Sequence, residues 1–166
     1  LNTYLNTTYL GTINEDSKYI IKHDFNVGTP GNDSDTEDIA TDVAQEALYK
    51  WNGMIGLMNA TDALRTTTDM GCTSLKVARN GGNKSVCSNN NWMWPTAKQS
   101  VWTISPRSDS SGHVFEVMRD TYSDGYMSYG LAYNQTYAVL PVLYLTSDIR
   151  LEGEGTSDTP YTIVLQ

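Results

Sequence analysis

The stretch SVWTISPRSDSSGHVFEVMRDTYSDGYMSYG, residues 100–130, decides the fold of this chain. Short runs rich in Val, Trp, Ile, Phe and Tyr alternate there with clusters of Ser, Asp and Gly, which is the pattern of strands joined by turns. The next apolar run, YAVLPVLYLTSDI at residues 137–149, predicts a further strand, in which Pro141 requires a sheet edge or a bulge. The C-terminal half is therefore predicted to be mostly a twisted antiparallel sheet.

Helical patterns are confined to the N-terminal half of the sequence. Apolar and aromatic residues recur at helical spacing in residues 1–10. A second helix is predicted from Ser34, which has capping-box spacing to Glu37, with Ile39 and Val43 on one apolar face.

Two strands accompany these helices in the N-terminal half. They are predicted at residues 17–27 and 51–58, and the second leads into a short helix capped by Asn59 or Thr61. No linker or repeat divides the chain, so we expect an α+β fold in a single extracellular domain spanning residues 1–166.

Composition excludes one class of partner. Charged residues make up only 18% of the chain, its formal net charge is -8 and its pI is near 4.5. Such a surface repels a phosphate backbone, so nucleic acid is excluded as a partner. The sequence has no apolar run of about 18 residues, so this segment is not expected to insert into a membrane. It begins without Met, and we expect a signal or anchor to precede it.

The two cysteines, Cys72 and Cys87, flank the polar loop TSLKVARNGGNKSV. The sequence has no CxxC or Cys/His array, so a zinc site is not predicted. A disulfide is predicted instead, with two unpaired thiols as the alternative. The bond would contribute about 3 kcal/mol by constraining the unfolded chain, and it would indicate an oxidising, extracytoplasmic compartment.

No catalytic residue, metal site or cofactor is predicted. The two histidines, His23 and His113, lack a G-x-S-x-G or comparable nucleophile motif. The acidic run NDSDTED, residues 32–38, offers oxygen ligands for calcium, but it lacks the glycine and the distal Glu of an EF-hand. Carboxylates at the start of a helix explain this run as well.

Three tryptophans leave two interpretations open. Trp102 is expected in the core, together with Val142, because both lie in apolar strand segments. Trp92 and Trp94 follow three asparagines, and they are either core residues or a flat platform for a sugar ring.

A tyrosine-rich stretch is the strongest indication of function. Tyr combines a large contact area with few rotors, while Ser, Gly and Asn give adaptable hydrogen bonds, so binding loops use this mixture. The alternative is a half-exposed hairpin with cross-strand aromatic pairs. The predicted ligand-binding residues are Ser108, Asp109, Ser110, Ser111, Tyr122, Tyr126, Tyr129, Tyr133, Asn134 and Tyr137.

The segments VWTISP, AVLPVLYL and EGEGTSDTPYTIV, in this order, resemble a family of bacterial surface domains known mainly from Firmicutes and related bacteria. The resemblance covers most of the chain, and it implies a C-type-lectin-like layout with two helices before a twisted sheet, in some members behind a prepilin-like N-terminus. The chain departs from the family pattern at Leu140, where Arg is usual, and at Glu154, where Asp is commoner.

These expectations favour a non-catalytic recognition or adhesion module of a bacterial cell-surface or pilin-like protein. Its partner would be a protein or glycan ligand on a surface, bound through the variable polar face. In the alternative, the chain is a structural filament subunit that uses the same face to pack against its neighbours. A glycan-active enzyme is the third candidate, although no convincing carboxylate pair supports it.

Overall fold

The computed structural model describes residues 1–31, 38–79, 82–89, 91–94, 99–120, 123–155 and 158–165. The fold is mixed α+β, with short helices in the first half and mostly strands in the second, as predicted. The chain divides into two compact units. One comprises Leu1–His23, Asn52–Gly56 and Leu143–Gln166, and the other Asp24–Trp51 and Leu57–Val142. The expectation of a single domain stays a prediction.

A four-stranded sheet forms the centre of the larger unit. Its strand order is β7-β6-β5-β8, and the β5–β8 pair is parallel, so the sheet is mixed rather than purely antiparallel. Segment 132–137 causes this difference, because it carries the chain from the end of β7 back to the far side of β5. The strands are β5 (Val101–Arg107), β6 (Ser110–Asp120), β7 (Ser123–Leu131) and β8 (Ala138–Val139).

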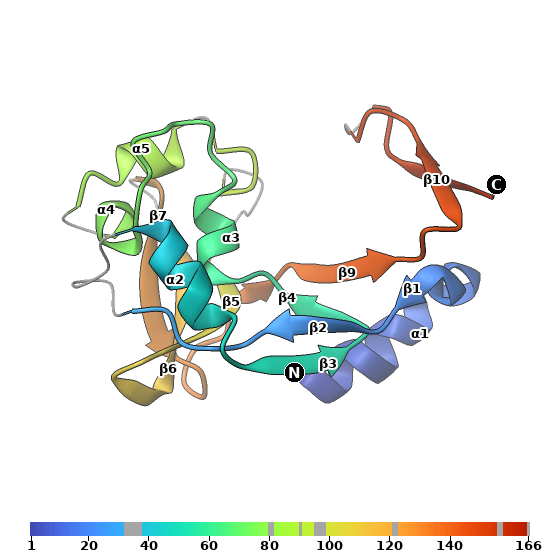
Figure 1. Cartoon of the computed structure of the whole chain (residues 1–166), viewed down its shortest axis with the longest axis horizontal. Helices are drawn as coiled ribbons and strands as arrows, with labels where there is room; N and C mark the ends of the chain where they lie inside the picture. The colour runs from blue at the N-terminus through green and yellow to red at the C-terminus, as the bar shows by residue number, and fades with distance from the viewer. Residues whose placement is uncertain are drawn as a thin grey trace. The chain divides into compact units, whose positions relative to one another are not determined.

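Short helices cover one face of this sheet (Figure 1). They are α3 (Ala60–Leu64), α4 (Leu75–Ala78) and α5 (Ser85–Ser88). Val101, Val117 and Met127 are neighbours across β5, β6 and β7, and they belong to the buried apolar cluster beneath the helices. Successive side chains of a strand point to opposite faces, so the next row of residues faces away from the helices.

Trp102 belongs to that second row. It is 8% exposed, so its predicted burial is confirmed, but it lies outside the main apolar cluster and packs against Tyr137 with the two rings tilted. The placement of Val142 in the same sheet was wrong. Val142 is partly buried against the main cluster, but it belongs to β9 (Pro141–Leu145), which joins a different sheet. The split after β8 occurs at Leu140, and Pro141 takes the first position of its strand, where its missing N–H is tolerated.

Helix α2 (Ile39–Glu46) begins at Asp38, whose carboxylate accepts a 2.7 Å hydrogen bond from the Thr41 N–H. The predicted capping pair, Ser34 and Glu37, lies outside the described residues. A second difference concerns the buried face. Val43 is only half-buried, whereas Asp42 and Glu46, four residues apart, are both 1% exposed. Helix α2 therefore buries acids where apolar residues were expected.

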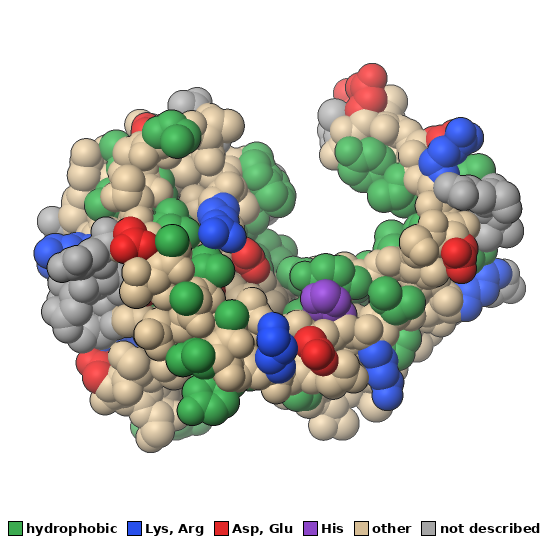
Figure 2. Space-filling model, viewed as in Figure 1, with side chains coloured by type: hydrophobic (Ala, Val, Ile, Leu, Met, Phe, Trp, Pro, Cys, Tyr) green, Lys and Arg blue, Asp and Glu red, His purple; other side chains and the backbone are tan. Residues whose placement is uncertain are grey.

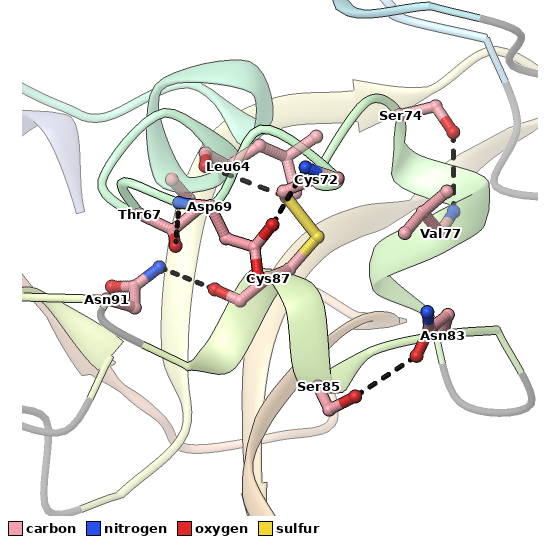
Figure 3. Close-up of a disulfide and its surroundings, with 12 residues drawn as sticks. Leu64, Thr67, Asp69, Cys72, Ser74, Val77, Asn83, Ser85, Cys87 and Asn91 are labelled. Carbon is pink, nitrogen blue, oxygen red and sulfur yellow. Dashed lines mark hydrogen bonds between the residues drawn. A yellow bond between two sulfur atoms is a disulfide. The ribbon is translucent and has the colours of Figure 1, made fainter.

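The predicted Cys72–Cys87 disulfide is confirmed. It joins the segment before α4 to α5 across a sequence separation of 15, and both cysteines are buried (Figure 3). The loop it closes contains α4, whose first turn is capped by the Ser74 hydroxyl at 3.3 Å from the Val77 N–H. The bond thus fixes α4 and α5 where both pack against β7.

The smaller unit starts with the predicted helix, observed as η1 (Tyr4–Tyr9) and α1 (Leu10–Thr12). The side-chain oxygen of Asn6 accepts hydrogen bonds from the backbone of Met54 and Ile55, both 3.0 Å long. The strand predicted at 17–27 is shorter than expected, because its start lies in a 3₁₀ turn. The other elements of this unit are η2 (Asn14–Tyr19), β1 (Ile20–Ile21), β10 (Ile149–Glu152) and β11 (Thr162–Leu165). Three further strands have residues in both units: β2 (His23–Asn26), β3 (Lys50–Gly53) and β4 (Ile55–Leu57).

Candidate recognition surface

A cluster of polar and aromatic side chains forms where β5 turns into β6. Arg107 is the last residue of β5, and its guanidinium donates to both carboxylate oxygens of Asp109, at 2.9 Å and 2.7 Å. This bidentate pair holds the pKa of Asp109 below its usual value. The Arg107 side chain is only 10% exposed, whereas that of Asp109 is 46% exposed. The Asp109 carboxylate is therefore accessible to solvent, while the Arg107 side chain that binds it is mostly buried.

Tyr129 of β7 forms the second side of this cluster. The Arg107 guanidinium carbon lies 3.5 Å from the centroid of the Tyr129 ring, in a cation–π arrangement. Tyr129 remains 40% exposed, so its ring is held in place on one side and accessible on the other.

His113 and Ser110 complete the cluster. The Ser110 hydroxyl and His113 Nδ1 are 2.6 Å apart, and the imidazole meets the Tyr129 ring edge-on at a centroid distance of 5.4 Å. Since Asp109 is bound by Arg107 through both oxygens, it does not orient this Ser–His pair as a hydrolytic triad requires. We name Arg107, Asp109, Ser110, His113 and Tyr129 the strand-end cluster.

The structure brings together only part of the predicted binding face. Asp109, Ser110 and Tyr129 lie in the strand-end cluster, and Tyr133, 76% exposed, packs near Gly112 beside it. Ser108, Ser111 and Asn134 are exposed. Tyr122 lies outside the described residues.

Two of the predicted tyrosines lie elsewhere. Tyr126 is partly buried beneath the Lys84 ammonium, which is 4.6 Å from its ring centroid. Tyr137 is half-buried, and its ring lies 4.8 Å from that of Trp102. The single exposed patch of five tyrosines was therefore wrong. The cause is the strand register, which places Tyr126 and Tyr129 on opposite faces of the sheet, while Tyr137, at the end of segment 132–137, packs against Trp102.

Sequence reasoning missed Arg107 and His113 as members of this surface. Arg107 pairs with Ser110 across the β5–β6 turn, and His113 pairs with Leu131 of β7, so Tyr129 is a diagonal neighbour of His113. Strand pairs counted outward from the β5–β6 turn would place Arg107 and His113 near Tyr129. The pairing of β5 with β6 contains two register shifts, however, and the sequence does not indicate them.

The tryptophans separate clearly. Trp94 is 1% exposed and donates its indole N–H to the Ala63 carbonyl at 3.0 Å, so it is a core residue. Trp92 is 70% exposed and borders a groove of about 480 Å³. Of the predicted sugar platform, only Trp92 is available. The groove is lined by Met58, Asp62, Arg65, Thr66, Trp92, Met93, Leu140, Pro141 and Val142.

Three carboxyl groups in the larger unit are buried, and burial raises the pKa of each. Asp42 reaches about 6 and Glu116 about 7. Glu46 is the best supported, since it accepts hydrogen bonds from the Ser105 hydroxyl at 2.6 Å and from the Thr61 hydroxyl. Glu116 lies in the sheet row that faces away from the helices.

Comparisons with protein-family models, with curated proteins and with solved structures found no match. The resemblance to bacterial surface domains and the C-type-lectin-like layout therefore stay predictions. None of the described helices has the length and apolar character needed to cross a membrane.

Proposed function

We propose that this chain is a non-catalytic recognition or adhesion module of a bacterial cell-surface or pilin-like protein, and that it binds through the strand-end cluster and the adjoining Tyr133. One observation carries the proposal: Arg107 is held between the Asp109 carboxylate and the exposed Tyr129 ring. Groups fixed before binding lose little conformational entropy when a ligand arrives, so they favour affinity. The disulfide supports an extracellular or cell-surface location, because such bonds persist in oxidising compartments.

The chemistry of the cluster suits a protein or glycan ligand. Tyr129 and Tyr133 offer flat apolar faces with hydroxyl groups, while Asp109 and His113 offer hydrogen-bonding groups beside them. Amphipathic aromatic residues next to anchored polar groups are typical of protein recognition surfaces.

An array of printed glycans and peptides, probed with labelled protein, tests this proposal. A Tyr129→Ala, Tyr133→Ala double variant should lower the affinity for the bound spots at least tenfold. Tyr133→Ala alone should change stability by no more than about 0.5 kcal/mol, as is usual for exposed sites. Tyr49→Ala is the matched control, because Tyr49 is 67% exposed and lies in the turn after α2. Equal binding by the double variant and the control would overturn the proposal.

A specific observation also favours the alternative, a filament subunit. Hydrophobic side chains gather on the β10–β11 hairpin of the smaller unit, where Leu151 is 44% and Tyr161 is 59% exposed (Figure 2). In this alternative the hairpin packs against a neighbouring subunit in addition to the polar face that the sequence predicts for this contact. Sedimentation over rising protein concentration separates the two functions, since a filament subunit assembles and a Leu151→Ser, Tyr161→Ser variant of it does not.

A further inference from the structure

Glu116 is a buried acid without an evident counter-charge. It is 0% exposed, and neither carboxyl oxygen has a hydrogen-bond partner of normal geometry among the described residues. Leaving a buried charge uncompensated costs several kcal/mol, so such a group is normally protonated or paired with a cation. An acid kept in this position therefore indicates a role beyond packing.

Aromatic rings line the surroundings of this acid. Trp102 and Ser128 are its direct neighbours across β5 and β7, and the ring of Tyr137 packs at a tilt against that of Trp102, with the centroids 4.8 Å apart. The carboxyl group also acts on Tyr137, whose pKa is raised by burial and by the charge of Glu116. An indole and a phenol thus flank a carboxylate, and both ring types attract cations through their faces.

The absence of a side chain at Gly130 lets an exposed residue approach this acid closely. A Cβ on Gly130 would lie 3.0 Å from Glu116 Oε2, 3.0 Å from Trp102 Cη2, and closest of all to Gln135 Oε1. Gln135 belongs to segment 132–137 and is exposed, yet the end of its side chain reaches this point. The amide of this exposed residue therefore lies next to the buried Glu116 carboxyl group.

We propose that the site formed by Trp102, Glu116, Gly130, Gln135 and Tyr137 binds a primary ammonium group, which enters in place of the Gln135 amide. Glu116 supplies the counter-charge, and Trp102 and Tyr137 supply aromatic walls around the aliphatic stem. This site, the Glu116 site, lies on the sheet face away from the helices and does not depend on the proposed role of the strand-end cluster.

The geometry selects this ligand class over other cations. One carboxylate and one amide oxygen are too few for calcium or magnesium, which take six or more oxygen ligands. A guanidinium group is wider than the single amide that it would replace, and a quaternary ammonium lacks N–H donors for the two oxygens. A primary ammonium is compact and carries three donors. The net charge of -8 further raises the local concentration of cations.

Protons compete with this ligand. Burial raises the pKa of Glu116 to about 7, and the Ser128 hydroxyl only partly opposes that rise. The titratable groups that face it are the phenols of Tyr137 and, next to it, Tyr126, and burial raises the pKa of Tyr137 further above its usual value. Between pH 5 and 8, Glu116 is therefore the group whose ionisation controls the site. Affinity should fall about tenfold for each pH unit below 7, because only the carboxylate binds the cation.

Titration of the intact chain with n-butylammonium chloride, followed by calorimetry at constant ionic strength, tests the proposal. Binding is expected at pH 8 and should be at least tenfold weaker at pH 5. Glu116→Gln should abolish binding of the ammonium probe. Gln135→Ala should strengthen binding, because it removes the amide that the ligand has to displace. Glu152→Gln is the control, since Glu152 is an exposed acid of the β10–β11 hairpin. The peptide acetyl-Gly-Lys-Gly-amide distinguishes two sources: tighter binding than n-butylammonium assigns the site to a lysine side chain, and equal binding to a free amine.

Three results would overturn the proposal. The first is no heat of binding at pH 8 for either probe up to about 50 mM, which corresponds to an affinity too weak for recognition. The second is unchanged binding in Glu116→Gln. The third is pH-independent binding by the unaltered chain, a measurement that remains decisive even if the variant fails to fold.

Discussion

Glu46 and Glu116 are both buried acids, at 1% and 0% exposure, but their carboxyl groups differ in the hydrogen bonds that they accept. Glu46 receives the hydroxyl groups of Ser105 and Thr61, and Ser105 in turn accepts the Ala60 N–H at 2.9 Å. Glu116 has the Ser128 hydroxyl as a neighbour, but neither of its oxygens has a hydrogen bond of normal geometry among the described residues. A fully bonded acid joins helices to a sheet, whereas an acid that lacks well-formed hydrogen bonds retains its capacity to bind a proton or a cation.

Removal of Glu46 should give the largest effect. Glu46→Ala leaves the hydroxyl groups of Ser105 and Thr61 without their acceptor and opens a void between α2, α3 and β5, so we expect a loss of about 3–5 kcal/mol of stability. Glu116→Gln, measured in parallel by urea unfolding at pH 8, should not destabilise the chain. Losses of equal size in the two variants would remove the distinction between the acids.

The pH dependence of stability gives the second effect. The folded-state pKa of Glu116 is about 7 against an ordinary 4.5, so the native chain binds the proton more tightly than the unfolded chain does. The resulting stability is fully present below pH 4.5 and is lost as the pH rises to 7, a loss of about 3 kcal/mol. Asp42, with a pKa of about 6, adds to this loss in the same direction.

Glu116→Gln isolates the contribution of Glu116 in a pair of urea titrations at pH 5 and pH 8. The variant and the unaltered chain should be about equally stable at pH 5, and the variant should be the more stable at pH 8. Parallel curves at both pH values would mean that Glu116 is already compensated in the folded chain.

The part of the fold that sequence could predict is the part governed by local patterns. Alternation of apolar residues predicted β5, β6 and β7, and an isolated pair of cysteines predicted the disulfide. Capping chemistry predicted Asn59 or Thr61 at the start of α3, and Asn59 is the residue found there. Each of these rests on residues close in sequence, or on a cysteine pair with no other cysteine to join.

The features that escaped prediction depend on register and on contacts distant in sequence. Glu46 and Ser105 are 59 residues apart, and nothing near either residue indicates the hydrogen bond between them. Helix α2 was assigned an apolar face from Val43, because a buried acid is not expected until its donors are known. Tyr129 and Tyr137 belong to one tyrosine-rich stretch, but the turn after β7 places them in different surroundings. The strand-end cluster was therefore predicted only in part, and the Glu116 site not at all.

The smallest expected effect on stability concerns Gly130, which lies beside Glu116. Gly130→Ala places a methyl group 3.0 Å from both Glu116 Oε2 and Trp102 Cη2, and both side chains are held in a packed layer, so we expect a loss of about 1–2 kcal/mol. Gly11→Ala is the control, because nothing lies within 4 Å of its added Cβ and the position is helical. That substitution should stabilise the chain by about 0.5–1 kcal/mol.

A double-mutant cycle tests whether the Gln135 side chain packs against Gly130 beside Glu116. The atom nearest to the new methyl group is Gln135 Oε1, the end of an exposed side chain. Gln135→Ala should therefore recover part of the loss caused by Gly130→Ala, with a coupling of about 0.5 kcal/mol measured by thermal or urea unfolding. If the changes in unfolding free energy of the two single variants simply add in the double variant, the Gln135 amide does not pack against Gly130. In that case the Gln135 amide would not be the group that a ligand displaces to reach Glu116.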